Sequence, residues 1–181
     1  KWLDYKMKAL VKHVPTFLCD SNHTIKDLKL LGPLPDNARL FTADAVSMYT
    51  NIHCEEGCAA FQGWFDDYAA ELPKNFPVAL FMAVLKIVMT NNVFQFDNTY
   101  WLQLSGTAMG TSCACLYATI FWGYIERKKI LPKWKPLLPY LKRFIDDKLG
   151  IWIGSDSEFE SFKADLNTHG SLSWITSCLQ T

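Results

Sequence analysis

Three aspartates are candidates for metal-dependent chemistry. Asp146 and Asp147 are adjacent and lie within an apolar stretch, 141–152, so we expect them at the tip of a β-hairpin. Aspartate is also an ordinary turn residue, and the pair alone would indicate no more than a turn. The third acid, Asp44, comes near the end of another predicted strand, 39–46. Two strand ends can bring the three carboxylates together.

Such a cluster calls for a cation. Neighbouring carboxylates repel one another, and burial raises their pKa unless positive charge is close. Two Mg²⁺ ions, with Mn²⁺ as the alternative, can be held by shared carboxylates and can stabilise both oxygens of a phosphoryl transfer. Because successive strand residues point to opposite faces, Asp146 and Asp147 are not equivalent. We rank Asp44 and Asp146 first and Asp147 second.

Two further features fit a nucleotide substrate. Tyr49 follows Asp44 by five positions, where its ring could cover a sugar, although a core aromatic is the plain alternative. The small-residue loop 105–113 would let its backbone approach a base or sugar closely. Lys148 directly follows the acid pair and either contacts a phosphate or neutralises the turn, and the sequence does not decide between these roles.

The composition sets the broad class. With 181 residues, half of them hydrophobic, the chain can form one domain with a sizeable core. The formal net charge is zero, which gives no electrostatic indication of a nucleic-acid partner. The six cysteines lack disulfide-framework spacing and no signal peptide is recognisable, so we expect an intracellular, reducing compartment. The apolar runs are too short to span a bilayer, and no membrane is expected.

Hydrophobic periodicity predicts an α+β fold. The expected helices cover 1–14, 24–31, 55–72, 78–91, 114–129 and 158–167, with strands at 39–46 and 172–178 and hairpins at 93–104 and 141–152. The hairpins make the sheet largely antiparallel, packed on helices. Helix 78–91 carries only Lys86 as a charge, so we expect it to be buried on most sides.

Three sequence strings resemble one family. The string 42–52 is similar to motif A of the reverse transcriptase palm, 103–111 to motif B and 143–147 to motif C, in the family's order and spacing. The resemblance extends from about residue 25 to residue 176 and is greatest to the Penelope-like retroelement branch.

The resemblance implies a right-hand polymerase palm. Residues 1–181 would form a single partial reverse transcriptase domain, with fingers helices and a hairpin inserted at about 57–104 and the thumb absent. The basic fingers motifs would precede Lys1 and the thumb would follow Thr181. On this view the fragment alone is expected to be inactive and the full-length protein active.

The resemblance also assigns roles to residues of the motif A and motif C strings. It implies that Asp44, Asp146 and Asp147 are the catalytic, metal-binding acids and that Ala45 adds a backbone carbonyl to the metal site. Tyr49 would bind the nucleotide as a steric gate, where an aromatic ring excludes the ribose 2′-hydroxyl.

The motif B string would contact the nucleotide and template. The resemblance places Gly106, Met109 and Gly110 against the incoming nucleotide. The Penelope-like branch accepts Met at position 109, whereas Cys115 stands where most reverse transcriptases have proline, so Cys115 is the departure from the family pattern.

The implied function is RNA-directed DNA synthesis by a retroelement protein. It would use two Mg²⁺ ions to join a deoxynucleoside triphosphate to a primer 3′-hydroxyl, with an RNA template and a DNA primer as partners and a nuclear location. Viral RNA-copying polymerases share the acid pattern but tend to carry an acid at the position of Tyr49. The alternative is an inactive or domesticated copy that binds nucleic acid or a protein. The oligomeric state stays open.

Overall fold

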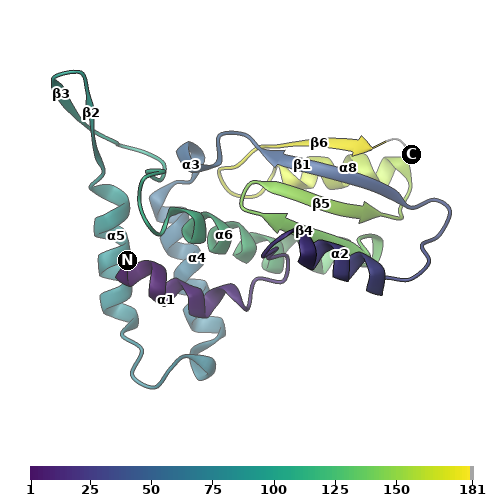
Figure 1. Cartoon of the computed structure of the whole chain (residues 1–181), viewed down its shortest axis with the longest axis horizontal. Helices are drawn as coiled ribbons and strands as arrows, with labels where there is room; N and C mark the ends of the chain where they lie inside the picture. The colour runs from purple at the N-terminus through teal and green to yellow at the C-terminus, as the bar shows by residue number, and fades with distance from the viewer. Residues whose placement is uncertain (180–181) are drawn as a thin grey trace.

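A four-stranded antiparallel sheet forms one layer of the molecule (Figure 1). The computed structural model describes residues 1–179. The sheet has the order β4-β5-β1-β6, and its strands are β1 (Arg39–Ala45), β4 (Tyr140–Phe144), β5 (Asp147–Trp152) and β6 (Trp174–Leu179). Every neighbouring pair is antiparallel. The predicted α+β class and antiparallel sheet are confirmed.

Alternation along β1 separates the core from the site. Phe41, Ala43 and Ala45 are buried, whereas Asp44 between them is exposed. Side chains of a strand point alternately to its two faces, so an apolar residue at every second position fixes which face meets the helices. The same alternation leaves the Asp44 carboxylate on the open face.

Helices cover the inner face of the sheet and extend beyond it. They are α1 (Trp2–Val11), α2 (Ser21–Leu30), α3 (Met48–Asn51), α4 (Cys54–Asp67), α5 (Val78–Thr90), α6 (Ala114–Ile125), α7 (Leu131–Trp134) and α8 (Asp156–Leu166), with a π-helical turn at Glu126–Ile130 and 3₁₀ turns at Ala69–Glu71 and Lys135–Leu137. Among the residues described, no helix has the length and apolar character needed to cross a bilayer.

Two helices illustrate how the sequence sets local structure. α8 begins at Ser155, whose hydroxyl accepts from the Glu158 N–H while the Glu158 carboxylate accepts from the Ser155 N–H, a complete capping box. Phe162 of α8 then packs edge-on against Phe41 of β1. α6 is buried on most of its circumference and packs against α1 and α4.

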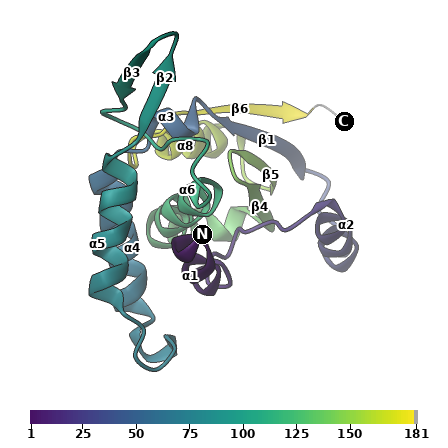
Figure 2. The same cartoon turned by 60° about the vertical axis from the view of Figure 1, so that its left-hand side comes forward.

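α5 corrects one expectation. Its buried residues are Phe81, Leu85 and Met89, whereas Leu80 is 55% exposed and Ile87 is 61% exposed. The helix lies on the outside of the molecule alongside α4 (Figure 2) and buries a single face. The prediction of burial on most sides was wrong because apolar composition reports what a helix could bury, not how many neighbours surround it.

A separate hairpin projects from the body. β2 (Val93–Phe96) and β3 (Thr99–Leu102) form the hairpin predicted at 93–104, with a turn at Asp97-Asn98 in which Asp97 has a φ of +53°. Both strands are exposed along their whole length. The hairpin stands beyond the end of α5, away from the four-stranded sheet (Figures 1 and 2).

Candidate active site

Strand register brings two of the predicted acids face to face. Asp44, near the end of β1, pairs directly with Asp147, the first residue of β5. Directly opposed residues of an antiparallel pair project to the same face, with Cβ atoms about 4.5–5.5 Å apart. Asp146 lies in the turn before β5, and its carbonyl accepts a hydrogen bond of 3.1 Å from the Ala45 N–H. All three acids therefore lie at one end of the two inner strands.

The acids perturb one another. The pKa of Asp147 is raised above its usual 3.8, first by partial burial and then by the carboxylates of Asp146 and Asp44. This repulsion is what a divalent cation would relieve. Carboxylate oxygens are the ligands that Mg²⁺ prefers, so the donors fit such an ion in their chemistry.

The structure singles out a pair within the predicted trio. Within residues 1–179, no group of three or more His, Cys, Asp and Glu side chains is arranged to hold a metal ion. Asp147 is the direct ladder partner of Asp44. Asp146 lies in the adjoining two-residue turn 145–146, and its rank ahead of Asp147 as a metal ligand stays a prediction.

Tyr49 lies beside the acidic turn. Ser47 adopts a left-handed conformation with φ +47° and starts the short helix α3, which carries Tyr49. The Tyr49 hydroxyl donates to Cys115 Sγ at 3.3 Å. Burial raises the pKa of Tyr49, and Cys115 and the Asp146 carboxylate raise it further. Cys115, the departure from the family pattern, is thus a direct neighbour of the predicted gate residue.

The small-residue loop docks on α3 through Gly106. Gly106 is buried with φ +78°, and a Cβ there would lie 2.6 Å from the Thr50 carbonyl oxygen and 2.7 Å from that of Tyr49. Only glycine adopts this conformation and this approach without strain. Next to it, the Thr107 N–H donates to the Tyr49 carbonyl at 2.5 Å. The structure therefore brings Gly106 to the backbone of Tyr49.

Met109 and Gly110 lie on the outer part of the same loop. Met109 is 72% exposed, and a Cβ built at Gly110 meets no heavy atom within 4 Å. Both residues face open space, where a bound molecule could reach them.

Lys148 takes neither role considered for it. Its side chain is buried, and Nζ lies 3.3 Å from Glu126 Oε1. Burial lowers the pKa of Lys148 to about 7, against the opposing effect of Glu126. The ammonium therefore balances a buried carboxylate instead of the turn or a phosphate. Sequence reasoning missed Glu126 and its other partner, Arg143, although Glu126 is the first acid after the apolar run of α6.

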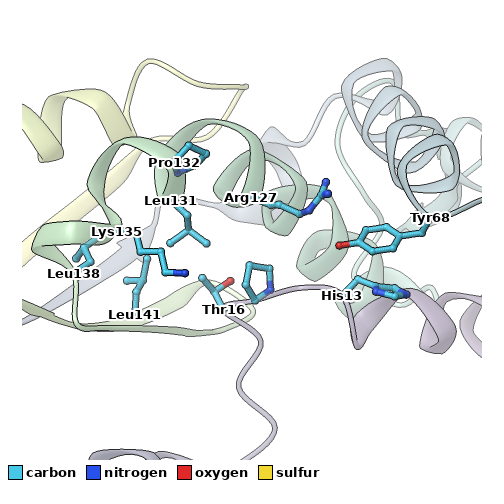
Figure 3. Close-up of a pocket in the computed structure, with 10 residues that line it drawn as sticks. His13, Thr16, Tyr68, Arg127, Leu131, Pro132, Lys135, Leu138 and Leu141 are labelled. Carbon is cyan, nitrogen blue, oxygen red and sulfur yellow. The ribbon is translucent and has the colours of Figure 1, made fainter. Parts of the chain in front are cut away.

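A cavity of about 540 Å³ lies elsewhere, between the segment 13–16 after α1, Tyr68 just after α4, and the segment from Arg127 to Leu141 (Figure 3). Its lining includes His13, Tyr68 and Arg127, and none of the predicted site residues. The His13 ring stacks on Tyr68 with centroids 3.8 Å apart. Burial lowers the pKa of His13, and the neighbouring Arg127 lowers it further while Glu71 opposes the shift.

The fold is shared with nucleic-acid polymerases. No protein-family model and no curated protein sequence matches the chain. Apo telomerase from Candida tropicalis superposes with a TM-score of 0.74 at 13% identity, covering 99% of this chain and 36% of that one. Telomerase from Candida albicans, in complex with a TWJ fragment of telomeric RNA, gives 0.74 at 11% identity, covering 99% and 35%. The BmCPV RNA-dependent RNA polymerase at elongation state gives 0.60 at 13%, covering 80% and 15%.

These similarities establish a polymerase palm-like fold. The chain spans about 32 to 40% of the length of the telomerase chains it matches. At such low identities the likeness concerns the fold alone, and the chemistry has to be argued from the residues of this chain.

Proposed function

We propose that this chain is the palm of an RNA-directed DNA polymerase from a retroelement, most similar to the Penelope-like branch. The observation that carries the proposal is the direct pairing of Asp44 with Asp147 at the end of the two inner strands, in a polymerase-like fold. Asp44, Asp146 and Asp147, with the Ala45 carbonyl, would hold two Mg²⁺ ions, or Mn²⁺.

The residues of the chain would divide the work. Divalent ions, when bound, would stabilise the attacking and leaving oxygens of an in-line displacement. The opposed carboxylates hold the positive charge on the open face of the sheet. Tyr49 limits the space beside the sugar, and Gly106 keeps the loop backbone against α3, which leaves Met109 and Gly110 facing the nucleotide and template.

The partners follow from the same proposal. An RNA template, a DNA primer and deoxynucleoside triphosphates would bind across the open face, in the nucleus. The structure of the Candida albicans telomerase in complex with telomeric RNA supports nucleic-acid binding by this fold. The insertion of about 57–104, which comprises most of α4, all of α5 and the hairpin β2–β3, would belong to the fingers. It extends away from the four-stranded sheet (Figure 2).

Primer extension tests the activity. The longest polypeptide that carries this chain should extend a DNA primer on an RNA template when Mg²⁺ and deoxynucleotides are present. Asp44→Asn and Asp147→Asn should each abolish extension, whereas Asp66→Asn, an exposed acid of α4, should not. Equal extension by the Asp147→Asn variant would remove the acids from the mechanism. No extension by any variant would favour an inactive, binding-only copy.

Sugar selection tests the gate. Tyr49→Ala should admit ribonucleotides, because the smaller side chain leaves room for a 2′-hydroxyl. Tyr49→Phe keeps the ring and should still exclude them. Ribonucleotide use by the native enzyme would point to an RNA-copying polymerase instead.

A further inference from the structure

Three charged side chains are buried together beneath the acidic turn. Glu126 and Arg143 have no exposed surface, and Lys148 is 2% exposed. Arg143 Nε lies 3.1 and 3.2 Å from the two Glu126 carboxylate oxygens, and the Thr16 hydroxyl donates to the same carboxylate. The Lys148 ammonium lies 3.3 Å from the centroid of the Trp174 ring. Burying charges is costly even when they are paired, so this cluster calls for a reason beyond packing.

The strands put this cluster and the acids on opposite faces of one hairpin. Arg143 of β4 pairs directly with Lys148 of β5, and the next pair toward the turn is Phe144 with Asp147. Because side chains alternate, the cations project inward and Asp147 projects outward. The inner and outer groups are therefore connected through the backbone of the turn 145–146.

Arg143 binds that turn directly. Its Nη1 donates to the Ile145 carbonyl at 2.7 Å, and its Nη2 donates to the Thr119 carbonyl at 2.9 Å. Ile145 has a φ of +55°, a left-handed conformation that is strained for an L-residue and least suited to a β-branched side chain. Two-residue hairpin turns normally place glycine or asparagine at such positions. The turn thus keeps a strained residue whose carbonyl is fixed by a buried guanidinium.

The turn also fixes the positions of the acids. The carbonyl of Asp146, next to Ile145, accepts from the Ala45 N–H, and Asp147 follows in register with Asp44. A planar guanidinium held by a carboxylate on one side can donate to fixed carbonyls on the other, which an ammonium cannot do at several points at once.

We propose that Arg143, held by Glu126, is a positioning residue that keeps the turn 145–146 in the conformation that places Asp147 opposite Asp44, the pair that would hold a divalent cation. The inference rests on the proposed function, since it concerns the same metal-binding acids. Arg143 itself touches none of their carboxylates through the bonds described above.

Mn²⁺ binding to the 181-residue chain tests this role, measured by electron paramagnetic resonance and calorimetry. Arg143→Lys keeps the positive charge beside Glu126 but loses the simultaneous bonds to the turn. It should weaken Mn²⁺ binding by about 10- to 100-fold, as outer-sphere substitutions do at metal sites. The Ala45 amide resonance should shift in the same variant. Leu85→Val, a core change in α5, controls for a general loss of stability and should bind Mn²⁺ as the native chain does.

A milder variant keeps the test decisive if Arg143→Lys does not fold. Thr16→Val removes the hydroxyl that bonds Glu126 and should weaken Mn²⁺ binding several-fold, whereas Thr16→Ser retains the hydroxyl and should not. Unchanged affinity in folded Arg143→Lys and in Thr16→Val, with binding lost in Asp44→Asn, would overturn the positioning role and leave the metal site intact. Failure of the native chain to bind Mn²⁺, or full binding by Asp44→Asn, would overturn the metal site and the positioning role together.

Discussion

Replacing Asp147 by asparagine should stabilise the metal-free protein. Asp44 and Asp147 are direct cross-strand partners, and both side chains are exposed. Two unit charges about 5 Å apart in a water-like dielectric repel by about 0.8 kcal/mol. Asparagine is nearly isosteric and removes this repulsion. For a domain of this size, the melting temperature should rise by about 2–3 °C in the presence of a chelator.

The same variant should lose its response to metal. A ligand that binds only the folded state stabilises it by about 2.7 kcal/mol at a concentration one hundred times its Kd. The native chain should therefore gain stability from added Mn²⁺ and overtake the Asp147→Asn variant. The order of the two melting temperatures should reverse between chelator and metal.

The pH dependence has a defined sign. The pKa of Asp147 is raised above 3.8 in the folded chain. Between the unfolded and the folded pKa, the folded state therefore keeps a proton that the unfolded state has released. The stability associated with that proton is present below 3.8 and is lost as pH rises through the folded pKa. The advantage of Asp147→Asn should therefore be largest at neutral pH and should close as pH falls toward 3.8.

Thermal unfolding monitored by circular dichroism provides the assay. Asp66→Asn is the matched control, because it removes an exposed carboxylate on α4 and should change neither the melting temperature in chelator nor the response to Mn²⁺. A lower melting temperature for Asp147→Asn in chelator, with a native response to Mn²⁺, would refute the reasoning from register and repulsion.

Three further predictions concern other parts of the molecule. Glu126→Gln leaves the buried Arg143 and Lys148 without their carboxylate and should lower the free energy of unfolding by about 3–5 kcal/mol, measured with urea. An unchanged urea midpoint would contradict the ion cluster. The pKa of His13 is lowered below 6.5 in the folded chain, so the unfolded chain binds more protons and the free energy of unfolding should fall as pH drops below 6.5. His13→Gln should make the free energy of unfolding less dependent on pH. Unfolding experiments at pH 5 and pH 7 measure this difference. Gly106→Ala should cost more than about 1–2 kcal/mol, because φ is +78° and the new Cβ would clash with α3, whereas Gly110→Ala should be close to neutral in the same melting experiment.

Local patterns predicted most of the architecture. The apolar alternation of 39–46 and 141–152 identified the two strands that carry the acids, and the hairpin within 93–104 was placed correctly. These features depend on neighbouring residues in the chain, which a sequence displays directly. The helix predicted at 158–167 is observed as α8, although it begins two residues earlier, at Asp156.

Features that depend on distant partners were not predictable. The exposed face of α5 and the burial of Lys148 depend on what packs beside them, and the sequence does not display those neighbours. The length of the turn between β4 and β5, which places Asp146 in the turn and Asp147 in the ladder, was also not given by alternation alone. Glu126 was not singled out from the sequence, since its partners lie 17 and 22 positions further along the chain.

The order of strands in the sheet has a consequence for how the acids persist. β1 and β5 are the inner strands, each hydrogen-bonded on both edges. Local opening of the strand ends that carry Asp44 and Asp147 should therefore cost a large free energy. Opening these strand ends requires unfolding of most of the domain. A destabilising substitution in the core therefore lowers the population of intact acid sites as much as it lowers the population of folded protein. The projecting β2–β3 hairpin has no such protection, and a protease should nick it while the acids are still in place.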